Sequence, residues 1–213
     1  MKVLFDTAMP PCKRHGLTPN YILYVRCRNV GKRCLLRSYV DGQFPNDDVK
    51  NVSNGYKKDI EFLGKSIRLV LWDINVEEEN ARLRHLTYPL TDLFLLCFSL
   101  VDQNSMENIE KIWHREITRH CPHTPFILVG TKSDLLDNNM LSSHGRCSGC
   151  VRTKAEELCK RIHAFKYVEC SSLIRDGLDN VFSVGLHSIC STQTSNGDEN
   201  EEEQKEVKNC VLM

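Results

Sequence analysis

Two adjacent residues, Gly31 and Lys32, are of the types that bind phosphate. They lie in the stretch YVRCRNVGKRCLL (residues 24–36), which matches part of the loop pattern G-x-x-x-x-G-K-[ST]. In that pattern glycine lets backbone N–H groups approach phosphate, lysine reaches the outer phosphates, and the final hydroxyl ligates Mg²⁺. Arg26 replaces the first glycine and Arg33 replaces the hydroxyl. The stretch therefore predicts a loop-to-helix joint that has lost part of its phosphate chemistry.

A second group of side chains has the chemistry of a zinc site. Residues 144–150 (HGRCSGC) hold a C-x-x-C with a histidine, and Cys12 with His15 would complete four ligands. The first group follows a central strand of the predicted sheet, whereas the second precedes the first strand, at the opposite edge. We therefore expect no zinc site and interpret these cysteines as surface thiols.

Hydrophobic patterns predict the sheet that must position these groups. Residues 59–73 alternate in polarity around a Gly64-Lys65 turn, which predicts a hairpin. Short apolar runs predict strands at residues 21–25 and 166–170, and continuous runs typical of buried parallel strands occur at residues 92–100 and 125–130. Apolar stripes predict three helices: Ile109, Ile112, Trp113 and Ile117; Ala155, Leu158, Cys159 and Ile162; and Leu178, Val181, Phe182 and Ile189. This alternation predicts an α/β fold with a mostly parallel sheet and helices on both faces.

Composition limits the classes of function. The chain has 213 residues, 41% of them hydrophobic, which predicts one domain with a core. Its 28 basic residues balance 28 acidic ones, so it lacks the basic field of a nucleic-acid-binding protein. The eleven cysteines occur without a secretory leader pattern, and we interpret them as reduced thiols of a cytoplasmic protein. The longest apolar run, residues 93–101, is about half the roughly 20 residues of a membrane span.

The end of the chain is predicted to be a disordered, solvated acidic tail. Residues 191–213 hold six acids and two lysines, a net charge of −4. They end in Cys210-Val-Leu-Met, and a C-a-a-X ending with methionine is a farnesylation signal; an unmodified tail is the alternative. Cys190, at the expected end of the last helix, is interpreted as a structural thiol rather than a second lipid site. We therefore divide the chain into a flexible extension (1–19), a domain (20–190) and this tail, whose lipid would hold the protein at the cytoplasmic face of a membrane.

Three longer stretches carry a family resemblance. LRHLTYPLTDLFLLCFSLV (residues 83–101), CPHTPFILVGTKSDL (residues 121–135) and KYVECSSL (residues 166–173), with the C-a-a-X ending, resemble the Rho family of Ras-like small GTPases. The resemblance runs from about residue 20 to residue 190. It implies a small G-protein fold, with a six-stranded sheet and five helices, that binds GDP or GTP with Mg²⁺ and changes shape with the γ-phosphate.

The resemblance implies an intact guanine-binding end. Asp134 would accept hydrogen bonds from the guanine N1–H and exocyclic amine, and Lys132 would stack its stem along the ring. Backbone N–H groups near Ser171 and Ser172 would hold the guanine oxygen; an ordinary turn is the alternative for the TKSD stretch. The positions implied to contact nucleotide are Gly31, Lys32, Arg33, Cys34, Phe44, Asp73, Thr131, Lys132, Asp134, Ser171 and Ser172.

The phosphate end departs from the family pattern. Arg28 stands where bulk obstructs the catalytic glutamine and the arginine finger of a partner. The guanidinium of Arg33 cannot ligate Mg²⁺, and at ~4 Å in an effective dielectric of ~20 it would be repelled by about 8 kcal/mol. We therefore expect weak nucleotide binding and poor Mg²⁺ binding, with Arg33 as a substitute cation for phosphate. Lys32 either fills the site with its own charge or is a solvated or loop-bracing lysine.

Three switch positions are also substituted. Asn51 aligns with the threonine that closes on Mg²⁺, Val76 with the glycine that senses the γ-phosphate, and Glu77 with the glutamine that orients water. The metal-linked aspartate is retained as Asp73. Because hydrolysis needs all these parts together, we expect no ordinary GTPase activity and no catalytic residue, and interpret the chain as a pseudo-GTPase.

An apolar surface near the second switch is the expected partner site. Trp72, Leu83, Leu86 and Tyr88 either dock regulators there or pack the switch onto the sheet. We expect a monomeric, prenylated adaptor of Rho-type signalling at the cytoskeleton or membrane. This adaptor would retain guanine recognition but not catalysis. A working GTPase with non-standard residues and a decayed paralogue without a partner remain the alternatives.

Overall fold

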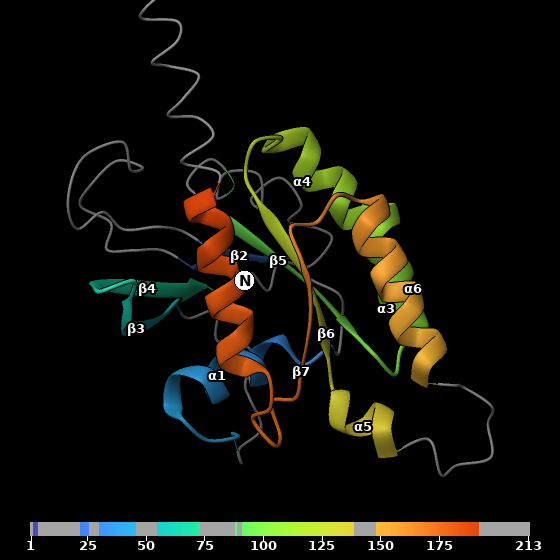
Figure 1. Cartoon of the computed structure of the whole chain (residues 1–213), viewed down its shortest axis with the longest axis horizontal. Coiled ribbons are helices and arrows are strands. Elements are labelled where there is room, and N and C mark those ends of the chain that lie inside the picture. Colours follow the sequence, from blue (N-terminus) through green and yellow to red (C-terminus); the bar gives the residue numbers. More distant parts are fainter. Residues whose placement is uncertain are drawn as a thin grey trace, which may run out of the picture.

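One sheet of seven strands organises the structure, a computed structural model that describes residues 2–3, 22–25, 30–45, 55–72, 88, 91–138 and 148–191 (Figure 1). The strand order is β3-β4-β1-β2-β5-β6-β7. The strands are β1 (Lys2–Val3), β2 (Ile22–Val25), β3 (Gly55–Phe62), β4 (Lys65–Trp72), β5 (Leu93–Ser99), β6 (Phe126–Thr131) and β7 (Tyr167–Cys170). The helices are α1 (Lys32–Asp41), α3 (Gln103–Asn108), the π-helical η3 (Ile109–His114), α4 (Arg115–His120), α5 (Ser133–Asn138), α6 (Ser148–Arg161) and a last helix at residues 178–191.

The predicted α/β class and the mostly parallel sheet are confirmed. Strands β2, β5, β6 and β7 pair in parallel, and β3 pairs with β4 in an antiparallel hairpin. The seventh strand is β1, which lies antiparallel between β2 and β4. Its two residues fall within the segment expected to be a flexible extension, and the sequence did not predict their pairing.

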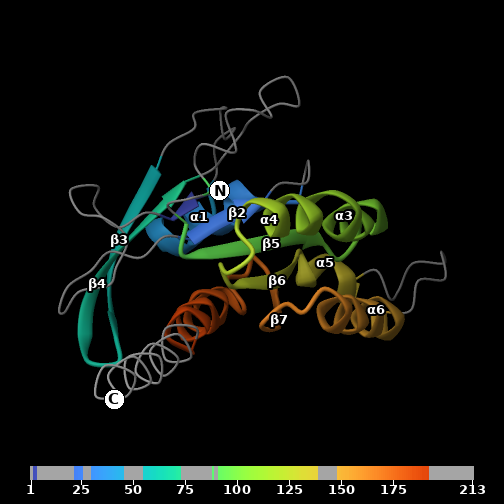
Figure 2. The same ribbon diagram turned by 90° about the horizontal axis from the view of Figure 1, so that it is seen from above.

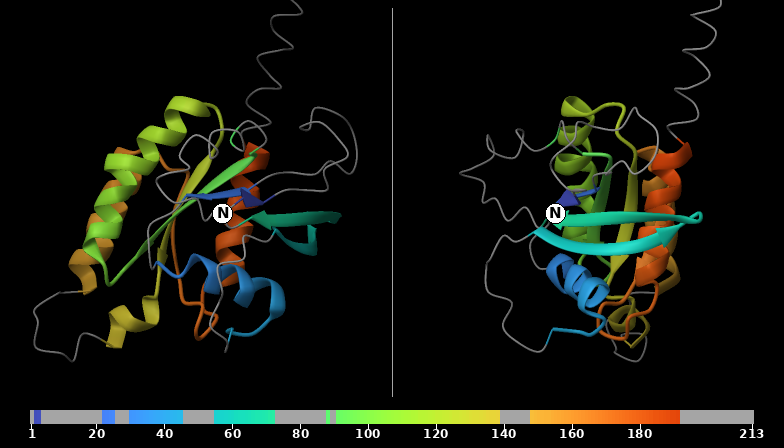
Figure 3. Two further views of the ribbon diagram at one scale, coloured as in Figure 1. Left: turned by 180° about the vertical axis from the view of Figure 1, so that it is seen from behind. Right: turned by 90° about the vertical axis from the view of Figure 1, so that its left-hand side faces the viewer.

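Helices cover both faces of the sheet, as Figures 2 and 3 show. Strand β5 is buried along its whole length because its alternate side chains enter two different cores. Leu93, Leu95 and Cys97 pack with α1 and the last helix, whereas Phe94, Leu96 and Phe98 pack with α3, η3, α4 and α6. Burying each of these large side chains contributes roughly 1.5–3 kcal/mol. The continuous apolar run therefore reads correctly as a strand buried on both faces.

The hairpin differs from its prediction by one residue. Leu63 and Gly64 both have positive φ, 51° and 72°, and connect β3 to β4. Two-residue turns with positive φ match the right-handed twist of the flanking strands. The predicted Gly64-Lys65 turn is therefore wrong at Lys65, which is the first residue of β4.

The helical segment between β5 and β6 contains a π-helical turn. Asp102 caps its start, because its side chain accepts hydrogen bonds from the backbone N–H groups of Asn104 and Ser105. Ile109 and Ile117 are buried, but Ile112 is 45% exposed. The wider π turn at Ile109–His114 breaks the period of 3.6 residues on which the predicted stripe depends. The prediction that Ile112 faces the core is therefore wrong, whereas the stripes of α6 and of the last helix are buried as predicted.

Candidate nucleotide site

The described residues that are expected to bind nucleotide belong to elements that meet at one end of the sheet. The carboxyl ends of β6 and β7, together with the start of α1, lie at the lower side of Figure 1. In open α/β sheets ligands bind outside the carboxyl ends of the strands. The topology therefore places the candidate residues where a ligand is expected.

Helix α1 begins with the chemistry of an anion site. Gly31 is its N-cap with φ of 82°, a left-handed conformation that suits glycine, and no side chain caps the helix. Uncapped N–H groups at a helix start favour negative charge, and the first turn contains no acid. Lys32 is buried, with 9% of its surface exposed, so the interpretation of Lys32 as a solvated lysine is wrong.

Thr131 connects the phosphate loop to the central strands. Its buried hydroxyl oxygen lies 2.5 Å from the carbonyl oxygen of Val30 and 2.9 Å from that of Phe98. One hydroxyl has one proton to donate, so the two carbonyls share it. Thr131 therefore fixes the backbone just before Gly31, a packing role that the sequence did not reveal.

Lys132 joins the two ends of the site. It has a φ of 61°, and left-handed backbone costs roughly 1–2 kcal/mol at a residue other than glycine. Its carbonyl accepts hydrogen bonds from the N–H groups of Leu135 and Leu136, at 3.1 and 3.3 Å, so the chain enters α5 at once. A Cβ placed on Gly31 would lie 3.6 Å from Cε of Lys132, which shows that the lysine stem passes over the glycine. The Lys132 stem, which was expected to stack along the guanine ring, thus lies beside the start of α1.

Asp134 and Ser171, two residues expected to bind the guanine base, are in direct contact. The Ser171 hydroxyl donates to Oδ1 of Asp134 at 2.5 Å, and the Ser171 N–H donates to the carbonyl of Asp176 at 2.9 Å. Ser171 is fully buried. The serine therefore holds the aspartate in one orientation, and because a carboxylate has about four acceptor positions, it still has capacity for a ligand. The predicted role of Ser171 rested on its backbone, and this side-chain contact was missed.

Ser38 was also missed by the sequence analysis. Its hydroxyl donates to the carbonyl oxygen of Ser172 at 3.1 Å, and the contact is buried. The bond ties the middle of α1 to the loop after β7. The available signal was a polar residue at a position of α1 that faces the core, between the buried Leu35 and Tyr39.

The loop after β7 is closed by Gly177. Its φ is 69°, and a Cβ there would lie 2.3 Å from the carbonyl oxygen of Glu169. No side chain fits so close to backbone. The neighbouring Cys170 is buried, and burial together with the carboxylates of Asp176, Glu169 and Asp134 raises its pKa to about 12. Cys170 is therefore a neutral packing group rather than a nucleophile.

Cations surround Cys34 in the first turn of α1. Burial raises the pKa of this half-buried thiol, while the charges of Lys132, Arg33 and Arg37 act in the opposite direction. The three cations give the phosphate end a positive field. Phe44, the expected aromatic beside the base, is half-buried just beyond the end of α1.

One expected Mg²⁺ ligand is replaced by an arginine. Arg33 is the second residue of α1, where the family pattern has a hydroxyl ligand, and a guanidinium offers no lone pair to a metal. Among the described residues no cluster of three or more His, Cys, Asp or Glu side chains could hold a metal ion. Several predicted positions lie outside the described residues: Arg26, Arg28, Asn51, Asp73, Val76, Glu77 and the potential zinc ligands Cys12 and His15.

The structure decides two further expectations. Tyr88 is 2% exposed, its hydroxyl donates to the carboxylate of Glu116, and its ring meets that of Phe94 edge-on at 5.6 Å. Of the two alternatives for Tyr88, docking and packing, the structure therefore shows packing against the sheet. Cys190 is exposed, so the interpretation of it as a structural thiol is wrong.

The rest of the expected docking and lipid residues are not described. Leu83, Leu86 and Cys210 lie outside the described residues, as does the side chain of Trp72. Within the described ranges, every helix is too short or too polar to cross a bilayer.

Comparison with known proteins gives two findings. The family model described as "Ras family" matches residues 22–191. The "GTP-binding protein RHO4" of Saccharomyces cerevisiae is 39% identical over 183 residues, which cover 84% of this chain and 61% of the yeast protein. The chain thus spans about three-fifths of the length of this relative.

Proposed function

Because the chain is a Rho-type member of the Ras family, we propose that it is a signalling adaptor that recognises guanine but does not hydrolyse GTP. Nucleotide is held mainly by its base, and the phosphates are held by cationic side chains and backbone rather than through a metal ion. The observation that carries this proposal is the position of Arg33 in the first turn of α1, combined with the ordered Asp134–Ser171 pair.

The base end supports guanine recognition. Asp134 is oriented by the Ser171 hydroxyl, and an ionised carboxylate accepts from the N1–H and the exocyclic amine of guanine together. Adenine has neither donor at these positions. The stem of Lys132, fixed by its left-handed backbone, offers a surface for the ring. These residues therefore provide selectivity for the base without any contribution from the phosphate end.

The phosphate end supports binding without hydrolysis. The N–H groups at the start of α1 and the charges of Lys32 and Arg33 favour a phosphate. Hydrolysis needs in addition an oriented water and a group that senses the γ-phosphate, and in this chain Glu77 and Val76 occupy those positions. A carboxylate at position 77 would repel the phosphate charge that it has to approach. The substitutions therefore impair GTP hydrolysis more than they impair nucleotide binding.

The nucleotide content of purified protein tests this proposal. The protein is denatured, and any released GDP or GTP is separated by ion-exchange chromatography. We expect less than one equivalent of guanine nucleotide, with the same retention in EDTA as in Mg²⁺, and no phosphate release from added GTP. A full equivalent released by EDTA would support a working GTPase with non-standard residues. The absence of any guanine nucleotide binding in a folded protein would support a chain that has lost the whole site.

We propose further that the tail carries a farnesyl group on Cys210. A single lipid gives only marginal, reversible membrane binding, and the net charge of −4 on residues 191–213 works against an anionic membrane surface. The protein would then divide between the cytoplasm and weakly charged internal membranes. In a fluorescent N-terminal fusion, Cys210→Ser is expected to be fully soluble, and changing Glu199, Glu201, Glu202 and Glu203 to lysine is expected to move the protein to the plasma membrane. A Cys210→Ser protein that still sediments with membranes would contradict the lipid.

The partner is proposed to be a protein that docks beside the second switch. With Tyr88 buried, the proposal rests on Leu83 and Leu86, whose leucine side chains are suited to an apolar contact. Pull-downs that compare the natural chain with Leu86→Asp are expected to show a loss of partner. Unchanged recovery with a folded variant would count against docking at this surface.

A further inference from the structure

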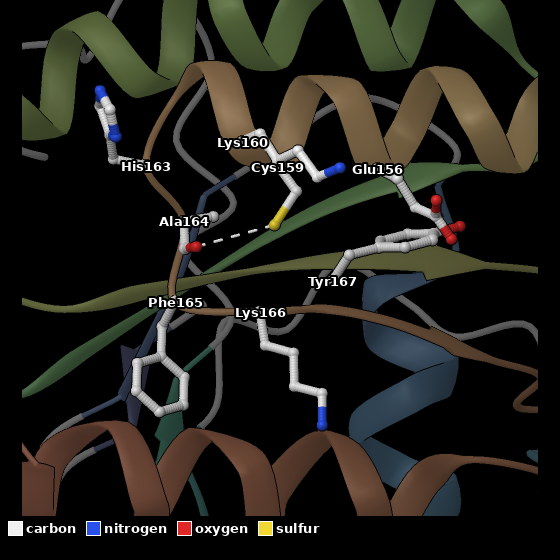
Figure 4. Close-up of a pocket in the computed structure, with 8 residues that line it drawn as sticks. All are labelled: Glu156, Cys159, Lys160, His163, Ala164, Phe165, Lys166 and Tyr167. Carbon is white, nitrogen blue, oxygen red and sulfur yellow. Dashed lines mark hydrogen bonds between the residues drawn. The ribbon is translucent and has the colours of Figure 1, made fainter.

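A pocket of about 600 Å³ lies at the edge of the sheet, away from the nucleotide residues. Its lining comes from the C-terminal half of α6, the loop that follows and Tyr167, the first residue of β7 (Figure 4). The nucleotide residues lie beyond the carboxyl end of the same strand. Because β7 is the last strand in the sheet order, the pocket lies at the rim of the fold.

The pocket carries two lysines without acidic partners. Lys160 and Lys166 are both exposed, and within the described ranges neither side chain forms an ion pair. By contrast, the adjacent Arg161 donates two hydrogen bonds to the carboxylate of Glu110, at 2.8 and 2.9 Å. Glu156 is the acid in the lining, so the two lysines leave an excess of positive charge. The lining therefore favours an anionic occupant.

The same pocket has an apolar side. The ring of Phe165 is 47% exposed, which is unusual for a large aromatic group, and it projects with Lys166 toward the last helix in Figure 4. Lys160 projects from α6 on the other side. The thiol of Cys159 lies 3.7 Å from the carbonyl oxygen of Ala164 and is buried. An occupant that passes between the lysines would thus meet cations on both sides and an aromatic ring.

The chain itself contains a segment of matching chemistry. Residues 198–206 (DENEEEQKE) hold six acids and one lysine, and Val207 follows them. In an extended segment successive side chains point to opposite sides. The run Glu201, Glu202 and Glu203 would therefore present carboxylates toward both lysines of the pocket. The aliphatic Val207 follows four residues after this run and would contact the ring of Phe165.

The segment leaves the domain at the right end and is long enough. The C-terminal end of the last helix and the loop after α6 lie at the same upper end of the sheet in Figure 1, and Figure 3 shows the same arrangement from behind. Residues 198–206 begin seven positions after residue 191, a reach of about 23 Å when extended, and end fifteen positions after it, a reach of about 50 Å. A small domain is roughly 30 Å across. The acids can therefore reach the pocket without strain.

We propose that the acidic segment 198–206 docks in the pocket between α6 and β7, with its glutamates paired to Lys160 and Lys166 and its apolar end against Phe165. The docking itself depends on neither nucleotide nor lipid. It can therefore be tested whether or not the proposed function holds.

Docking does not need a high intrinsic affinity. A short flexible connection keeps a tethered segment at an effective concentration in the millimolar range. A contact with a dissociation constant of about 1 mM would then be occupied for about half of the time. Acylation of Lys160 and Lys166 should accordingly be slowed about twofold by the docked tail, and high salt should remove the protection.

Lysine acylation in the full-length chain measures this protection. The unprenylated protein is treated with a limiting acetylating reagent, and the rates at individual lysines are followed by mass spectrometry. The variant Glu201→Gln/Glu202→Gln/Glu203→Gln removes three charges and nothing else from the tail. We expect Lys160 and Lys166 to react about twofold faster in this variant and Lys154, exposed elsewhere on α6, to react at the same rate.

Carbodiimide cross-linking identifies the occupant. Links from the segment 198–206 to Lys160 or Lys166 within one chain are expected, and a mixture of isotope-labelled and unlabelled protein distinguishes them from links between chains. Links between chains would overturn the proposal in favour of a second copy. Equal lysine reactivity in both proteins would also overturn it, as would protection that appears only with phosphatidylserine vesicles and is independent of the three glutamates.

Discussion

The base-binding end and the phosphate-binding end of the site share helix α1 but differ in how their residues are held. At the base end, buried hydrogen bonds join segments that are far apart in sequence: Ser171 donates to Asp134, and Ser38 donates to the carbonyl of Ser172. At the phosphate end, Gly31 keeps the backbone geometry of the helix start, while Arg33 stands half-buried in place of a ligand hydroxyl. The base end is held by hydrogen bonds that side chains form between distant segments, whereas the phosphate end is held through its backbone, by Thr131 at Val30 and by the glycine conformation at position 31.

This difference shows which chemistry the fold itself requires. Thr131 fixes the backbone at Val30, and the stem of Lys132 passes over Gly31, so these residues stabilise the fold as well as facing a ligand. Position 33 lies in the first turn of α1, where an arginine is accommodated with the helix intact. The residues expected at the base end therefore contribute to the fold, whereas α1 accommodates an arginine at position 33.

The largest effect is expected from Asp134→Ala. The change removes an acceptor of two charge-assisted hydrogen bonds, each worth roughly 1.5–3 kcal/mol, so guanine nucleotide affinity should fall by a factor on the order of 10² to 10⁴. Titration with a fluorescent GDP analogue measures the loss. The matched control is Asp59→Ala, which removes an exposed carboxylate on β3 that pairs with Arg68. This control should bind guanine nucleotide with the affinity of the natural chain. Equal affinity in the two variants would show that the base end does not read guanine.

The next effect concerns Gly177, the glycine that closes the loop after β7. In Gly177→Ala the new Cβ would have to displace backbone that lies 2.3 Å away, in addition to the cost of positive φ. Gly64→Ala has the same cost of φ but nothing within 4 Å. Urea unfolding should show a loss of about 1 kcal/mol for Gly64→Ala and of roughly 3 kcal/mol or more for Gly177→Ala. Similar losses in both variants would mean that the loop after β7 adapts easily and that the base end is less rigid than the contacts suggest.

Much of the fold could be predicted from periodicity because burial on two faces leaves a clear pattern. Strand β5 reads as a continuous apolar run, and its side chains alternate between two cores as that pattern implies. Ile112 and β1 escaped prediction for opposite reasons. The π turn at Ile109–His114 changes the helical period locally, and a two-residue strand is too short to have a period at all.

The site could be predicted as a set of positions but not as a set of contacts. Gly31, Lys132, Asp134 and Ser171 were identified from motifs, and the structure places Asp134 against Ser171 and the Lys132 stem beside Gly31. The contacts of Ser38 and of the Ser171 side chain could not be foreseen, because a hydroxyl pairs with whatever tertiary packing places beside it. Burial of Tyr88 likewise depends on the helix that carries Glu116, which lies 28 residues further along the chain.

A smaller effect is expected from restoring the hydroxyl at the phosphate end. Arg33→Thr removes the repulsion between a guanidinium and a metal ion and supplies an oxygen ligand. GDP release should become about tenfold slower in Mg²⁺ than in EDTA, a difference of 1.4 kcal/mol, while the natural chain shows none. Turnover of GTP should remain absent, because Val76 and Glu77 are unchanged. The control Arg33→Ala removes the charge repulsion of Mg²⁺ without supplying an oxygen ligand. If GDP release from Arg33→Thr responds to Mg²⁺ no more than release from Arg33→Ala does, further Mg²⁺ ligands are missing.

The smallest effect is expected on the alkylation rate of Cys34, which reports whether the guanidinium of Arg33 lies near the phosphate end or out in solvent. Burial raises the pKa of the Cys34 thiol, and the charge of Lys132, followed by that of Arg33, pulls it back down. Because a thiolate is the reactive form, removing Arg33 should raise the pKa of Cys34 further and slow its alkylation at pH 8 by about twofold. Mass spectrometry of the Arg33→Ala protein after timed iodoacetamide treatment gives the rate, with the exposed Cys190 in the same molecule as an internal standard. If the rate at Cys34 is unchanged relative to Cys190, the guanidinium lies out in solvent, and the positive field available to a phosphate comes from Lys32 and Lys132 instead.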